Sequence, residues 1–150
     1  MKRMIFAAML VAGPALAGDY DEFRACVEAV EGAAVTATFH HCTHAIAAPC
    51  GASKTAKEAA ACMDGERAEM EAEIEAQIAV LAAKTGDAPD EVRGALEGNR
   101  SAGEASCAIM AQRDAAAGVA VGQRAVNGAF CGMIVTGDVL GFAYRLETDE

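Results

Sequence analysis

The sequence is short of basic residues, and this shortage limits what the protein can bind. It has 12 Lys and Arg against 22 Asp and Glu, a formal net charge of −10 at pH 7. Such a charge repels nucleic acid and anionic lipid surfaces and attracts cationic molecules. We therefore expect no nucleic-acid ligand. If the protein has a macromolecular partner, we expect that partner to be a cationic protein.

The chain also lacks the short motifs of common enzyme classes. It contains no Gly-x-Ser-x-Gly, no glycine-rich phosphate loop and no His-Glu-x-x-His. A Cys–His pair is the one nucleophilic candidate, and it would need Cys42 as a free thiolate beside a positioned base. A complete set of disulfides removes that thiol, so we expect no enzymatic activity and no cofactor.

Residues 1–17 have the pattern of a cleavable signal peptide. Lys2 and Arg3 precede an apolar run, Pro14 interrupts it, and Ala15-Leu16-Ala17 offers the small-x-small cleavage pattern. No Cys follows the cleavage point, so we expect no lipid anchor. The prediction is a periplasmic or secreted single domain over residues 18–150, and the loss of Lys2 and Arg3 changes its net charge from −10 to −12.

Six cysteines follow the predicted leader: Cys26, Cys42, Cys50, Cys62, Cys107 and Cys131. An even number in a small exported domain is typical of disulfides, because the compartment is oxidising. Six cysteines allow 15 pairings, and spacing can rank them but not choose among them.

The clearest helix signals lie in residues 55–86, around which we expect the chain to be organised. Thr55 and Glu58 form a capping box, and Gly86 suits the left-handed end of a helix. Apolar residues recur on one face of this segment: Met63, Met70, Ile74, Ile78 and Leu81. We expect this helix to be the scaffold against which both halves of the chain pack.

Residues 18–49 predict a helical hairpin that precedes a core of residues 50–150. Apolar side chains recur at helical spacing in both arms of the hairpin, and Pro49 ends the second arm. The apolar residues of the first arm are Phe23, Cys26, Val27 and Val30, and those of the second are Val35, Phe39, Cys42 and Ile46. The hairpin would bring Cys26 opposite Cys42. A Cys50–Cys62 bridge would attach it to the next helix.

Two further helices are expected after Gly86. Asp87 and Pro89 suit the cap and first turn of a fourth helix, in which Gly94, Gly98 and Gly103 either permit close helix contact or mark a break. A fifth helix would follow Gly118. Residues 130–144 also fit a β-hairpin, because short β-branched runs flank a Gly-Asp pair, but helical spacing is favoured. Polar residues at 123, 124 and 127 argue against a membrane span in this region.

The densest group of ligand-type side chains is His40, His41, Cys42 and His44, with Cys50 nearby. A zinc or copper site is the alternative interpretation here. Adjacent histidines point about 100° apart on a helix, and no second Cys-x-x-Cys or His-x-x-x-His pair completes a tetrahedral set. We therefore expect no bound metal. We expect the histidines to be solvated beside a disulfide.

The acidic side of the 55–86 helix has two interpretations. Such a run usually keeps a helix in solvent. It can also form a docking surface for a cationic protein, where complementary charge speeds association and sets orientation. The candidate partner-binding residues on this side are Glu66, Glu69 and Glu73.

These features together resemble a family of small exported bacterial domains, that of the N-terminal domain of the lysozyme inhibitor LprI. The resemblance covers most of residues 18–150 and is carried by Cys50 and Cys62 near Glu66, by Ile74, Ile78 and Leu81, by Cys107, and by Cys131 followed by Thr136. The Cys26/Cys42 hairpin looks like an extension found in some members. The chain departs from the family pattern at Glu75, at Asn99, where the family has Trp, and at Val139.

The resemblance implies an all-helical, disulfide-linked periplasmic domain that inhibits lysozyme-type muramidases by protein contact. We accordingly predict an all-α, monomeric bundle of about five helices with bridges Cys26–Cys42, Cys50–Cys62 and Cys107–Cys131. The alternative function is an envelope structural or stress protein with no enzyme target, and a metal-binding module ranks third.

Overall fold

The protein is an all-α bundle, seen here in a computed structural model that describes residues 19–29 and 35–148. These residues form five α-helices and one 3₁₀-helix: α1 (Asp19–Glu28), α2 (Val35–Ala47), η1 (Ala48–Ala52), α3 (Ala56–Thr85), α4 (Pro89–Ala116) and α5 (Val121–Thr148). The predicted signal peptide and its cleavage point lie outside the described residues. The predicted fold class is confirmed.

The ends of α3 are those that the sequence indicates. Thr55 is the N-cap, its side chain accepts the backbone N–H of Glu58, and the Glu58 carboxylate accepts the N–H of Thr55. Gly86 ends the helix in the left-handed conformation, at φ 81°. Each end thus satisfies backbone groups that a helix terminus would otherwise leave without partners.

The start of α4 differs slightly from the prediction. Its N-cap is Ala88 rather than Asp87, with Pro89 in the first turn. Because alanine has no side-chain acceptor, only the returning half of a capping box is present, in which the Ala88 N–H donates to Glu91 at 3.1 Å. Gly118, at φ 70°, lies in the turn between α4 and α5.

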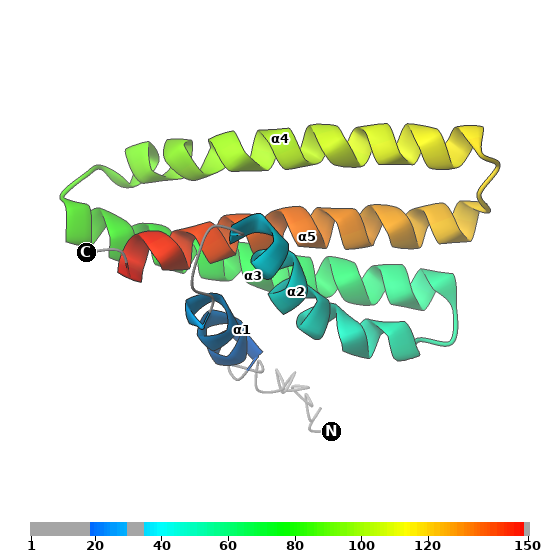
Figure 1. The fold of residues 1–150 in the computed structure, drawn as a ribbon, viewed down its shortest axis with the longest axis horizontal. Helices are drawn as coiled ribbons and strands as arrows, with labels where there is room; N and C mark the ends of the chain where they lie inside the picture. The colour runs from blue at the N-terminus through cyan, green and yellow to red at the C-terminus, as the bar shows by residue number, and fades with distance from the viewer. Residues whose placement is uncertain (1–18, 30–34, 149–150) are drawn as a thin grey trace, which may run out of the picture.

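Both halves of the chain pack against α3, as expected, since η1, α2, α4 and α5 all contact it, but α5 is the more central helix. α5 packs against α1, α2, α3 and α4, and Figure 1 shows it between α4 and the other helices. Among its most deeply buried residues are Met133, Leu140 and Tyr144. The β-hairpin alternative for residues 130–144 is excluded, since all of them belong to α5.

Two glycines of α5 bring α2 close to it. A Cβ atom at Gly137 would collide with the Thr43 side chain, and one at Gly141 would lie 2.7 Å from the Phe39 ring. Thr43 is fully buried and Phe39 is 2% exposed. The predicted hairpin therefore shares the core of the molecule, because Phe39 fills a space that only glycine on α5 leaves open.

The glycines of α4 do not break that helix, which is continuous from Pro89 to Ala116. Gly103 permits close contact, since a Cβ there would lie 2.7 Å from a methyl carbon of Val135 on α5. Gly94 and Gly98 instead face open space. Of the two interpretations offered by the sequence, close helix contact is correct at Gly103, and none of the three glycines breaks the helix.

Three disulfides hold the helices together. Cys26–Cys42 joins α1 to α2, Cys50–Cys62 joins η1 to α3, and Cys107–Cys131 joins α4 to α5, with Cα–Cα distances of 5.9, 5.6 and 5.8 Å. These are the three predicted pairs. No cysteine is free.

Candidate functional site

A groove of about 320 Å³ lies where α1, α2, η1 and α3 meet, and we name it the α1–α3 groove. It is lined by Glu22, Phe23, Cys26, Cys42, Ala45, Ile46, Pro49 and Glu66. The disulfide between Cys26 and Cys42 and the neighbouring apolar side chains make most of this lining apolar. Two carboxylates, from α1 and α3, supply its charge.

The three candidate partner-binding residues have different surroundings. Glu66 lines the α1–α3 groove, and its backbone carbonyl accepts the Tyr20 hydroxyl at 3.3 Å. Glu69 is exposed. Glu73 is half-buried and takes part in hydrogen bonds within the protein. The structure therefore places Glu66 and Glu69 where a partner can reach them, and directs the Glu73 carboxylate inward.

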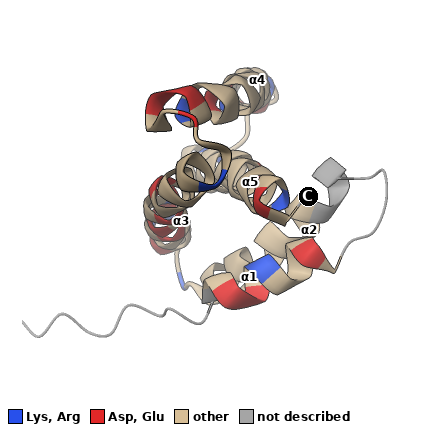
Figure 2. Ribbon diagram, turned by 90° about the vertical axis from the view of Figure 1, so that its left-hand side faces the viewer, with Lys and Arg blue, Asp and Glu red and all other residues tan. Residues whose placement is uncertain are grey.

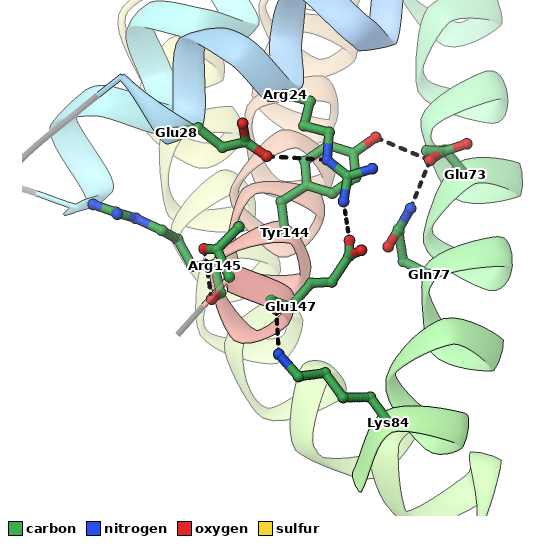
Figure 3. Close-up of polar contacts among 9 residues, drawn as sticks. Arg24, Glu28, Glu73, Gln77, Lys84, Tyr144, Arg145 and Glu147 are labelled. Carbon is green, nitrogen blue, oxygen red and sulfur yellow. Dashed lines mark hydrogen bonds and ion pairs between the residues drawn. The ribbon is translucent and has the colours of Figure 1, made fainter. Parts of the chain in front are cut away.

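Glu73 accepts two hydrogen bonds, one from α5 and one from within α3 (Figure 3). The Tyr144 hydroxyl donates to it at 2.9 Å, and the Gln77 amide nitrogen donates at 3.0 Å. Tyr144 is 1% exposed. Burial, and then the hydrogen bond to Glu73, raise the pKa of the Tyr144 hydroxyl above its ordinary value. The Tyr144–Glu73 hydrogen bond is therefore a polar contact within the packed core.

Arg24 connects α1 to the end of α5 in the same region. Its guanidinium forms ion pairs with Glu28, at 3.1 Å, and with Glu147, and its Cζ atom lies 4.8 Å from the centroid of the Tyr144 ring (Figure 3). The Lys84 ammonium donates to the backbone carbonyl of Glu147. These contacts hold α1 in place, and with it the wall of the groove that carries Glu22.

The acidic residues of α3 that face α4 are not simply solvated, which corrects one interpretation of this helix. Arg100 binds the Glu71 carboxylate through both terminal nitrogens, at 2.5 and 2.7 Å. Arg93 binds Glu75 at 2.7 Å, and this hydrogen bond lowers the pKa of the Glu75 carboxyl. Two arginines of α4 therefore neutralise one side of α3. Figure 2 shows acidic residues on both α1 and α3.

The histidines and cysteines of α2 do not assemble around a common point. The Nε2 atom of His40 lies 3.0 Å from the Oδ2 atom of Asp138. The centroid of the His44 ring lies 4.9 Å from the centroid of the Phe130 ring. Cys42 and Cys50 are bound in disulfides. Within residues 19–29 and 35–148, no three His, Cys, Asp or Glu side chains gather in a metal-binding arrangement.

Sequence reasoning missed two features of the site. Glu22 carries no motif, and only the packing of α1 on α2 brings it to the groove beside Glu66. Arg93 and Arg100 were not recognised as partners of the α3 acids, since they lie 18 and 29 residues from them. Glu71 and Glu75 are four residues apart and Arg93 and Arg100 seven, so each pair lies on one side of its helix, and this spacing could have indicated the second feature. Nothing in the sequence indicated the first.

One helix in the described part of the chain, α5, is long and apolar enough to cross a membrane. In this structure four other helices surround it, and its apolar residues form much of the core. The polar residues near its start were the sequence-based argument against a span.

Comparison of the chain with protein-family models, with curated proteins and with solved structures found no match.

Proposed function

We propose that this chain is an exported, non-enzymatic binding protein that holds a cationic protein in the α1–α3 groove. The observation that carries the proposal is the lining of this groove. Glu22 and Glu66 stand on two different helices, the surface between them is apolar, and no Lys or Arg is among the lining residues that the structure describes. Such a groove suits a basic side chain better than any other common ligand group.

A Lys or Arg side chain would use both parts of the groove. Its alkyl stem can lie along the disulfide and the Ile46 side chain, while its charged head meets the carboxylates. The net charge of −10 adds a long-range attraction, which speeds association and orients the partner. Glu69, exposed one turn further along α3, extends the acidic surface beyond the groove.

The resemblance to the N-terminal domain of the lysozyme inhibitor LprI suggests the class of partner. Lysozyme-type muramidases are commonly cationic, so the charge of this protein is suited to binding one. The three disulfides agree with folding in an oxidising compartment. With the predicted leader at residues 1–17, this supports a periplasmic or secreted inhibitor.

Inhibition by contact alone is also consistent with the chemistry of the cysteines. All six are in disulfides, so Cys42 offers no thiolate beside the histidines of α2. The nucleophilic candidate identified in the sequence is thereby removed.

The test compares two double variants with the same change in charge. Glu22→Gln with Glu66→Gln neutralises the groove, whereas the control, Asp64→Asn with Asp87→Asn, neutralises two exposed carboxylates outside it. Binding to a cationic lysozyme is measured by calorimetry at low and high salt, together with the rate of cell-wall hydrolysis.

We expect the oxidised wild-type protein to bind and inhibit the lysozyme, and binding to weaken as salt screens the charges. The groove variant should bind at least about tenfold more weakly, equivalent to about 1.4 kcal/mol, and the control should change little. A wild-type protein that leaves lysozyme turnover unchanged refutes the muramidase partner. An equal loss of affinity in both double variants refutes the groove as the binding site.

A further inference from the structure

A second cleft, of about 260 Å³, lies between α3, α4 and α5, and we name it the Arg67 cleft. It shares no lining residue with the α1–α3 groove. Two arginines and two glutamates line it, Arg67 and Glu71 from α3 and Arg100 and Glu104 from α4. Its charge is therefore balanced, unlike that of the groove.

The cleft exists because α4 and α5 bring few large side chains to this place. The buried residues of α4 are Val92 and Leu96, both in its first third, so none lies beside the cleft. On α5 the cleft is lined by Val135 and Thr136 and also by Gly128 and Gly132, which have no side chains to fill it. The disulfide between Cys107 and Cys131 holds the two helices together nearby.

One of the two arginines is already fully engaged. Arg100, with 15% of its side chain exposed, makes a bidentate ion pair with Glu71 and a further contact with Glu97 at 3.3 Å. The Thr136 hydroxyl also donates to the Glu71 carboxylate, at 3.2 Å. Because Glu71 has these partners, it is not bonded to Arg67, although the two lie four residues apart on one helix.

Arg67 instead extends across to α5. Its guanidinium occupies the place where a side chain at Gly132 would begin, since a Cβ there would lie 2.7 Å from Nη1. Among the described residues, Arg67 has no hydrogen bond or ion pair. Glu104, on the opposite helix, also has neither, and its charge acts on Arg100 only at longer range. The cleft therefore presents one guanidinium and one carboxylate that do not bind each other.

We propose that the Arg67 cleft binds a small zwitterion, a free amino acid or dipeptide, with its carboxylate at Arg67 and its ammonium at Glu104. A guanidinium is the preferred partner of a carboxylate, which it binds through two parallel hydrogen bonds. An ammonium group donates three hydrogen bonds and complements Glu104. The volume is below the roughly 300–1,000 Å³ of pockets for drug-sized ligands, so the ligand is small.

The first experiment varies the charges of the ligand and uses the wild-type protein. Alanyl-alanine is titrated in the millimolar range while amide chemical shifts are followed by NMR. N-acetyl-alanyl-alanine keeps only the carboxylate, and alanyl-alanine amide keeps only the ammonium. We expect the amides of Gly128 and Gly132 to shift with the zwitterion, and each singly charged ligand to bind at least about tenfold more weakly. No shift, or equal shifts with all three ligands, overturns the proposal.

The second experiment varies the protein. Arg67→Gln and Glu104→Gln should each weaken dipeptide binding at least about tenfold, whereas Arg67→Lys should retain part of it because the charge remains. Lys57→Gln and Asp64→Asn, which change the same charges outside the cleft, serve as controls. Since Arg67 and Glu104 have no hydrogen-bonding partners within the described part of the chain, the variants should melt like the wild type. Unchanged affinity in folded Arg67→Gln and Glu104→Gln variants contradicts the assignment, and if either fails to fold, the ligand series decides.

Discussion

Gly137→Ala should destabilise this protein, although alanine normally favours a helix over glycine. The new Cβ would collide with the hydroxyl of Thr43 and lie 3.0 Å from its methyl carbon. Thr43 has no room to move, because it is fully buried and its hydroxyl donates to the Phe39 carbonyl at 2.8 Å. Forcing a methyl group into such a site typically costs about 1–3 kcal/mol.

The control for this substitution lies on the same helix. Gly128→Ala meets nothing within 4 Å, so it should gain the helix preference of alanine, up to about 1 kcal/mol. The same gain offsets up to about 1 kcal/mol of the collision cost at Gly137, which leaves a net loss of up to about 2 kcal/mol there. In a domain of this size, 1 kcal/mol moves the melting temperature by about 4 °C. The two variants should therefore move it in opposite directions.

Thermal and urea unfolding of the oxidised proteins, followed by circular dichroism, measure both effects. Thr43→Ala combined with Gly137→Ala should recover part of the loss, with a coupling energy of about 0.5–3 kcal/mol. If Gly137→Ala stabilises the protein as much as Gly128→Ala does, α2 does not pack on α5 in this way and the reasoning fails.

Three further outcomes are expected. Replacing both Cys107 and Cys131 with Ala should lower the free energy of unfolding by about 3 kcal/mol, as expected for a loop of 24 residues; a loss well below 1 kcal/mol in chemical unfolding would show that α4 is held on α5 by other contacts. Leu96→Ala should cost about 2–5 kcal/mol, because Leu96 is 2% exposed and is one of two buried residues of α4; an unchanged urea midpoint contradicts its burial. The raised pKa of Tyr144, due to burial and to Glu73, means that its contribution is fully present below about pH 10, the pKa of an unfolded tyrosine, and is lost as pH rises further. Tyr144→Phe should therefore flatten the decline in stability above about pH 10, and urea midpoints that fall equally in both proteins above that pH would count against this.

The helix ends and the cysteine pairs are the features that could be predicted from the sequence. Thr55, Glu58 and Gly86 determine the limits of α3 through contacts within a few residues of one another. Cysteines 12 to 24 residues apart on neighbouring helices also bond locally. Such interactions depend on short-range geometry, which spacing along the chain describes well.

The candidate sites could be predicted only in part. Helical spacing predicts Glu66 and Glu69 on one side of α3, and their role in binding a partner stays a prediction. That Glu73 turns toward Tyr144 could not be foreseen, since the two residues are 71 positions apart. Glu22 was missed for the same reason, because it reaches the groove through the packing of separate helices.

By itself, the sequence determined that this protein is a set of about five helices with an excess of negative charge, and it favoured three disulfides between neighbouring segments over the other pairings. Capping, helical spacing and composition suffice for that, because each acts within a helix or between neighbours. Only the tertiary structure decided that α5 rather than α3 lies at the centre, where Gly137 and Gly141 allow α2 to approach. Only it decided which acidic residues of α3 are neutralised by arginines and which remain beside the groove, because ion pairs between distant helices depend on how those helices pack.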